Sequence, residues 1–89
     1  MLVLPPELTH RQASPCLRML VQGLPSQTGP AVVVDAGSLK LFDSSALAVL
    51  LEFRRESLAL GKQFAIRGLS PRLADLAKLS GVAEFLIPS

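Results

Sequence analysis

The segment Asp43-Ser44-Ser45 places one acid and two hydroxyls side by side, directly before a strongly apolar run. An oxygen at such a place can cap a helix, because it accepts a hydrogen bond from a free backbone N–H of the first turn. When one residue caps, the other hydroxyl is left facing solvent. A phosphate on that hydroxyl is compatible with the positive helix end and adds about two negative charges to any flat surface pressed against it. The residues alone leave plain capping and a phosphorylatable docking site equally open.

The other chemically capable residues do not form the constellation that an enzyme needs. Asp35 ends an apolar run and Asp43 precedes a helix, but no base, metal site or oxyanion device accompanies this pair of acids. We therefore interpret them as a turn residue and a helix cap. His10 is the only histidine and is predicted to lie at the surface, whereas Cys16 is predicted to be a buried, inert thiol on an apolar helical face. We predict no catalytic residue, no metal and no cofactor.

Composition favours a protein that docks on other proteins. The 89 residues support a single domain over residues 1–89, and they are 49% hydrophobic but only 18% charged. This balance predicts buried elements, or a face reserved for a partner. The net charge of +2 is scattered, and the chain has no Trp or Tyr, so we predict no binding to nucleic acid. With no signal-peptide pattern and no apolar run long enough to span a bilayer, we expect a cytoplasmic protein without direct membrane insertion.

The first half of the chain predicts a strand, a helix and a second strand. Residues 1–4 read as a strand that the prolines after it end. A helix follows over about residues 9–23, either capped by Thr9 and kinked at Pro15 or beginning at Ser14-Pro15. After a loop over residues 25–30, the β-branched run Ala31–Ala36 predicts a central strand covered on both faces.

The second half predicts two further helices and two further strands. A loop over residues 37–43 leads into a helix from Ser44 to Leu60, apolar in its first half and charged in its second. A strand over residues 64–69, a helix opened by Ser70-Pro71, and a final strand from Glu84 to Pro88 complete the chain. Strands joined by helices run parallel. The predicted fold class is therefore α/β, with a four-stranded, mostly parallel sheet and about three to four helices.

The run from Val32 to Asp35, followed by Phe42 to Leu51, resembles the central signature of STAS domains, the family of the bacterial anti-anti-sigma factors. That signature is an apolar strand ending in Asp, a loop, and then Asp-Ser-Ser-Gly-Leu or a variant. Residues 4–9, and residues 66–70 with 76–81, are similar to further parts of the family pattern, so the likeness covers nearly the whole chain. It begins at the family's second strand. Ala46 stands where the family has Gly, which puts recognition by an anti-sigma kinase in doubt.

Two branches of the family imply different partners. In anti-anti-sigma factors the second hydroxyl of the motif is phosphorylated by an anti-sigma factor kinase, which implies Ser45 here. In the STAS subunit of the Mla phospholipid-transport ABC complex, the hydroxyl directly after Asp is the functional one, which implies Ser44. The short length and the Leu-Ala-Val-Leu-Leu helix start are more similar to this second type.

The resemblance thus implies a non-catalytic adaptor that docks on an ABC ATPase subunit with its membrane permease. Such an adaptor is peripheral to the inner membrane and serves outer-membrane lipid asymmetry. The alternative is an anti-sigma factor antagonist regulated by serine phosphorylation. The expected docking surface has Ser44 at its centre and comprises Lys40, Leu41, Phe42, Asp43, Ser44, Ser45 and Ala48. Leu41 and Phe42 are either apolar anchors of this surface or members of the core.

Overall fold

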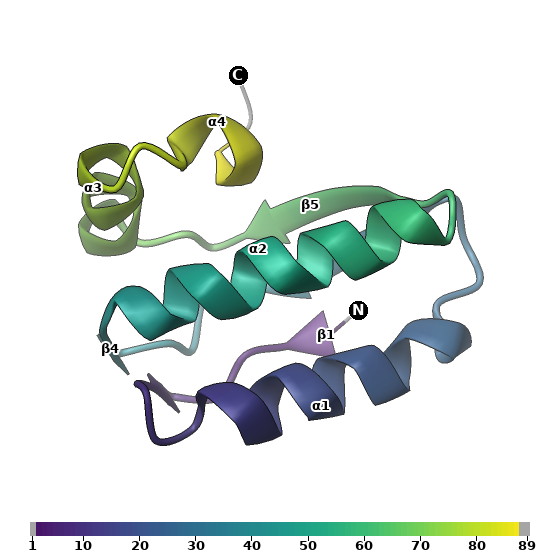
Figure 1. The fold of residues 1–89 in the computed structure, drawn as a ribbon, viewed down its shortest axis with the longest axis horizontal. Coiled ribbons are helices and arrows are strands. Elements are labelled where there is room, and N and C mark those ends of the chain that lie inside the picture. The colour runs from purple at the N-terminus through teal and green to yellow at the C-terminus, as the bar shows by residue number, and fades with distance from the viewer. Residues whose placement is uncertain (1, 88–89) are drawn as a thin grey trace.

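Three parallel strands form the main sheet of the computed structural model, which describes residues 2–87 (Figure 1). The strands are β1 (Leu2–Val3), β3 (Ala31–Asp35) and β5 (Gln63–Arg67). Their order is β1-β3-β5, so the β-branched strand β3 lies in the middle, as its composition predicts. Val34 stands opposite Leu2 on one side and Ile66 on the other.

A separate pair of two-residue strands lies beside the main sheet. β2 (Glu7–Leu8) runs parallel to β4 (Leu41–Phe42), and the Pro6 carbonyl accepts hydrogen bonds from the backbone N–H groups of Lys40 and Leu41 at 2.8 and 3.0 Å. The α/β class and the parallel strands are confirmed. The single four-stranded sheet is wrong, because the two prolines after Leu4 interrupt the first run and the last predicted strand is absent from the described residues.

Two long helices and two short ones connect or follow the strands, together with a 3-10 turn at Leu24–Ser26 (η1). They are α1 (Ala13–Gly23), α2 (Ser44–Ala59), α3 (Pro71–Leu79) and α4 (Ala83–Leu86). α2 and α3 lie within a residue or two of their predicted bounds. The Ser70 hydroxyl accepts a hydrogen bond from the Leu73 N–H at 3.2 Å, which confirms the cap predicted for α3.

α1 begins two residues before Pro15, which differs from both predicted starts. Its first helical hydrogen bond runs from the Cys16 N–H to the Gln12 carbonyl at 2.9 Å. Pro15 therefore occupies the first turn, where backbone N–H groups have no partner within the helix. The proline removes no helical bond there, so it neither kinks the helix nor marks its first residue.

The chain's last described segment is a helical turn and not the strand predicted over Glu84 to Pro88. α4 covers Ala83–Leu86, and Pro88 lies outside the described residues. Gly81, at a φ of 75°, ends α3 and redirects the chain. The turn then buries Leu86 while Phe85 stays exposed. Periodicity cannot distinguish a short apolar run in a strand from one in a helix.

The helices α1 and α2 cover one face of the main sheet (Figure 1). Val32 and Val34 are buried beneath them, whereas the alternate residue Val33 is only partly buried and Val3, on the edge strand, is 51% exposed. The expectation that the central strand is covered on both faces is therefore wrong.

Phe53 joins α2 to the sheet at the centre of the core. Its side chain is fully buried and meets the ring of Phe64 on β5 edge to face, with centroids 6.1 Å apart and planes at 75°. One turn later, the buried Ser57 hydroxyl donates to the Phe53 carbonyl at 2.8 Å. Within residues 2–87, no helix is long and apolar enough to cross a membrane.

Candidate functional site

Asp43 fixes the start of α2 to the turn that precedes α1. Its backbone is extended, and its Oδ1 accepts a hydrogen bond from the Ser45 N–H at 2.8 Å. Its Oδ2 accepts a second one from the His10 N–H at 3.1 Å, and the His10 Nδ1 lies 3.5 Å from the same oxygen. One carboxylate therefore caps a helix and also connects two segments that are far apart in the sequence.

These hydrogen bonds also set the charge of Asp43. The backbone N–H of Ser45, with a smaller contribution from that of His10, lowers the pKa of the Asp43 carboxyl below its usual range. Asp43 is thus an anion at neutral pH and only accepts hydrogen bonds. Asp35 has a comparable structural role, since its Oδ1 accepts from the Gly37 N–H at 2.8 Å. Each acid binds backbone groups of its own turn, as the turn and cap interpretation predicts.

The two serines of the motif differ in exposure. Ser44 is exposed, while Ser45 is half-buried and gives its backbone N–H to Asp43. Hydrogen bonding by the Ser45 side chain also contributes to the lowered pKa of Asp43. Ala46, at the position of the family's Gly, is fully buried. Ser44 is therefore the hydroxyl that this helix start presents to solvent.

Leu41 and Phe42, the two candidate anchors, point to different surroundings. Leu41 is 55% exposed, beside the exposed Lys40. Phe42 packs against the core, and the guanidinium of Arg72 on α3 lies 5.7 Å from the centre of its ring. Leu41 thus retains the properties of an anchor, and Phe42 contributes mainly to packing.

A shallow groove between α1 and α2 extends this surface. Ala48 is exposed one turn after Ser44 on the same side of α2. It lines the groove together with Ala13, Ser14, Leu17, Val49 and Glu52. The sequence analysis missed the contribution of α1. The small residues Ala13 and Ser14 at the start of α1 were the available signal, but their position opposite Ala48 depends on how the two helices pack.

The groups that could bind a metal ion or act as a nucleophile are few among the described residues. Among residues 2–87, no three side chains of His, Cys, Asp or Glu gather where they could hold a metal ion. Cys16 is buried, and burial raises the pKa of its thiol, so the thiol is protonated at neutral pH. The start of α2 instead combines an exposed hydroxyl, a small residue and a protruding leucine on a rigid, capped helix. Such a surface suits close contact with a flat partner.

The family model described as "Mlab, STAS domain" matches residues 1–88, which is nearly the whole chain. No curated protein matches the sequence.

Proposed function

Because the chain belongs to the MlaB-type STAS domain family, we propose that it is a non-catalytic adaptor that docks on the ATPase of an ABC-type phospholipid transport (Mla) system. STAS domains are protein-interaction modules, and the adaptor role is the specific form of this function that we infer. In this role the protein binds the ATPase subunit on the cytoplasmic side of the inner membrane. The ATPase and its membrane permease then act in maintaining outer-membrane lipid asymmetry.

The exposed strip of Ser44 and Ala48 at the capped start of α2 carries this proposal. Both side chains are small, so the backbone of a partner can approach closely, and Asp43 holds the strip in one conformation. Leu41 supplies an apolar anchor at the edge of the strip. The full docking surface that we propose is Lys40, Leu41, Phe42, Asp43, Ser44, Ser45 and Ala48.

The difference between the two serines supports the transport role over sigma-factor control. The MlaB pattern implies a functional hydroxyl at Ser44, which is exposed. The anti-sigma antagonist pattern implies phosphorylation of Ser45, which is half-buried against the carboxylate of Asp43. A kinase acting on Ser45 must reach a residue that is less exposed than Ser44. The antagonist role is therefore the second candidate, and the same experiment tests it.

The experiment is an affinity pull-down of the tagged protein from lysate of its own cells, followed by mass spectrometry. The wild type is expected to retain an ABC ATPase and a permease. Ser44→Asp is expected to reduce ATPase recovery about tenfold or more, because a charge without a partner in an interface costs on the order of 1–3 kcal/mol. Ser26→Asp, in η1, is the matched control and should bind as the wild type does.

Three outcomes separate the candidates. Equal recovery by Ser44→Asp and the wild type, with unchanged thermal melting of both, contradicts the docking surface. Recovery of a serine kinase of the anti-sigma type, with one phosphate on Ser45, supports the antagonist role. Retention of the ATPase by the wild type and its loss from Ser44→Asp supports the adaptor role.

A further inference from the structure

Within the described residues, the outer edge of strand β5 pairs with no other strand. Gln63 and Arg67 direct their backbone groups inward, toward β3. The Gln63 N–H donates to the Pro30 carbonyl at 2.9 Å, and the Arg67 carbonyl accepts from the Ala36 N–H at 2.7 Å. In a parallel strand the intervening residues point the other way, so Phe64 and Ile66 direct their N–H and C=O groups outward. Among the described strands, none pairs with this side of β5. Such an edge is a template for another extended chain.

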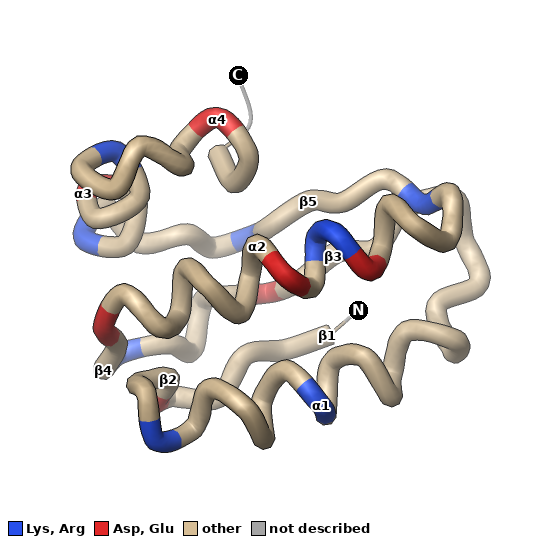
Figure 2. The backbone as a smooth tube through the Cα atoms, in the orientation of Figure 1, with Lys and Arg blue, Asp and Glu red and all other residues tan. Residues whose placement is uncertain are grey.

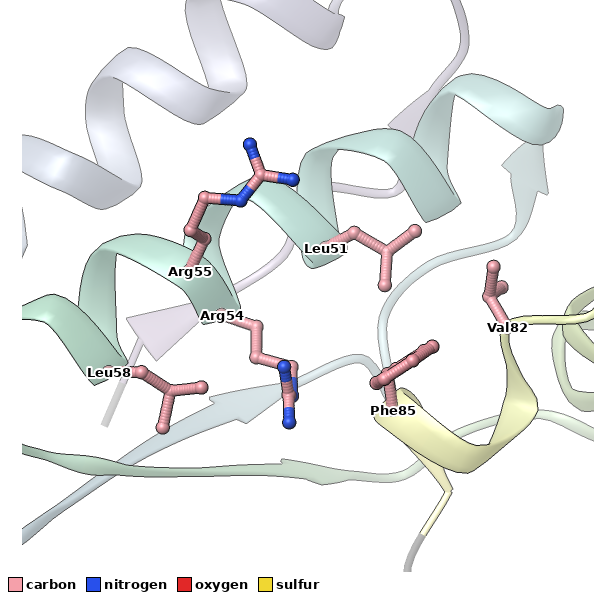
Figure 3. Close-up of a pocket in the computed structure, with 6 residues that line it drawn as sticks. All are labelled: Leu51, Arg54, Arg55, Leu58, Val82 and Phe85. Atoms are coloured by element: carbon pink, nitrogen blue, oxygen red, sulfur yellow. The ribbon is translucent and has the colours of Figure 1, made fainter.

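A groove lies along this edge, and its opposite wall is the end of the described chain. Residues 64–66 form one side of the groove, residues 84–87 form the other, and Arg54 of α2 lies between them. The hollow has a volume of about 400 Å³. A second hollow of about 300 Å³ adjoins it between α2 and α4 (Figure 3), lined by Leu51, Arg54, Arg55, Leu58, Val82 and Phe85. The two hollows share Arg54 and Phe85.

The hollow along β5 has a mixed lining that includes Arg54 and Glu84, whereas the adjoining hollow is mainly apolar. Leu58 is 44% exposed and Phe85 is 43% exposed. The guanidinium of Arg54 lies 5.1 Å from the centre of the Phe85 ring, and no described carboxylate forms an ion pair with it. Arg55 differs, because it pairs with Glu52 at 3.1 Å and points to the other side of the helix (Figure 3). Arg54 is therefore a cation that a ligand in the groove can pair with, while Glu84 is the acid that lines the same groove.

We propose that this groove binds an extended segment of a partner protein, which adds a strand to the outer edge of β5. The segment places an apolar side chain against Leu58 and Phe85 and a carboxylate on Arg54. Hydrogen bonds to the backbone of Phe64 and Ile66 supply affinity. The hollow beside Phe85 and the guanidinium of Arg54 select the side chains of the bound segment. Residues 84–87 wall the groove, so it admits a single extended chain, whereas the edge of a second folded copy must displace α4. This site is separate from the Ser44 strip and does not depend on the proposed adaptor role.

The test is a titration of the ¹⁵N-labelled full chain with the capped peptide Val-Glu-Val-Glu-Val, followed by NMR. The amide signals of Phe64 and Ile66 are expected to shift, while those of Ser44 and Ala48 stay unchanged. Arg54→Gln is expected to weaken binding about fivefold, the upper range for a partly exposed ion pair. Arg18→Gln removes the same charge at an exposed position of α1, outside both hollows, and is expected to change binding less than twofold. The peptide Val-Lys-Val-Lys-Val is expected to bind more weakly than its glutamate counterpart.

Three results would overturn the proposal. The first is an absence of shifts at Phe64 and Ile66 at millimolar peptide. The second is an equal effect of Arg54→Gln and Arg18→Gln. The third is a shift of the Phe64 and Ile66 signals with protein concentration alone, which assigns the edge to a second copy of the chain. Ser44→Asp is expected to bind the peptide as the wild type does, so failure of one proposal leaves the other standing.

Discussion

The two halves of α2 show how a single helix presents two unlike surfaces. The first half is free of charge, and its buried residues are Ala46, Leu47, Val49 and Leu50. The second half buries Phe53 and Ser57 but carries four charged residues, as the colours along the helix show (Figure 2). The exposed residues of the first half are Ser44 and Ala48, whereas those of the second half include the longer Arg55, Glu56 and Leu58.

The difference follows from the neighbours of each half. The first half packs against α1 and begins at a carboxylate cap, so its exposed side consists of little more than Ser44 and Ala48. The second half lies beside β5 and α4, where the long side chains of Arg54 and Leu58 wall a groove. In our two proposals, the first half is the contact for a folded partner, and the second half binds the side chains of an extended segment. The sheet beneath holds both in fixed positions.

The largest expected effect comes from Phe53, the buried residue of the second half that joins the helix to the sheet. Phe53→Ala removes a fully buried ring that contacts Phe64, and we expect a loss of about 3–5 kcal/mol in the free energy of unfolding. A domain of this kind has about 5–15 kcal/mol in total, so both surfaces weaken together. Urea unfolding measures the change. Leu60→Ala, at the exposed end of the same helix, is the control and should cost less than about 0.5 kcal/mol. A loss below about 1 kcal/mol for Phe53→Ala would contradict this account of the core.

A smaller and selective effect is expected from charges placed on one half only. Ala48→Glu puts a long anion on the flat strip, and we expect at least a tenfold loss of ATPase binding with no change in peptide binding at β5. Leu58→Glu is expected to do the opposite, because it places an anion in the apolar hollow. The measurements are the pull-down and the NMR titration described above. If either variant weakens both activities while its thermal melting is unchanged, the two surfaces are not independent.

The smallest expected effect is a change in the stability of the fold at acidic pH. The lowered pKa of Asp43 means that its ionised form stabilises the folded state. This contribution is complete above the unfolded value of about 4 and is lost as the pH falls through the lower folded value. Asp43→Asn keeps an oxygen that can cap but cannot ionise. Its melting temperature is expected to be a few degrees lower at pH 7 and to fall less steeply than that of the wild type below about pH 4. Asp75→Asn, on the exposed side of α3, should leave the acid dependence as it is in the wild type.

The elements that the sequence predicts well are those with local signals. The β-branched run of β3, the Ser70-Pro71 start of α3 and the apolar start of α2 each determine their own conformation. The two-residue strands β2 and β4 have no such signal, because they exist only through their pairing across the chain. α4 was predicted as a strand since its apolar run is too short to show a period.

The candidate site shows the same contrast between local signals and contacts across the chain. The capping role of Asp43 was predictable from its place before an apolar helix. Its bond to the His10 N–H and the contribution of Ser14 to the docking groove depend on how α1 packs on α2. The groove at β5 depends on where α4 lies, so a wrong assignment of the last segment concealed it. Local chemistry was thus predictable, but the contacts that complete each surface were not.

The position of β3 between β1 and β5 determines the order in which this sheet can assemble. Neither neighbour is adjacent to it in sequence, since all of α1 lies on one side and all of α2 on the other. No hairpin can nucleate the sheet, and every pairing must first close a long loop. The five register pairs between β3 and β5 offset the entropy lost on loop closure more fully than the two pairs that hold β1. Folding is therefore expected to proceed outward from the β3–α2–β5 unit, with the N-terminal strand joining last and detaching first.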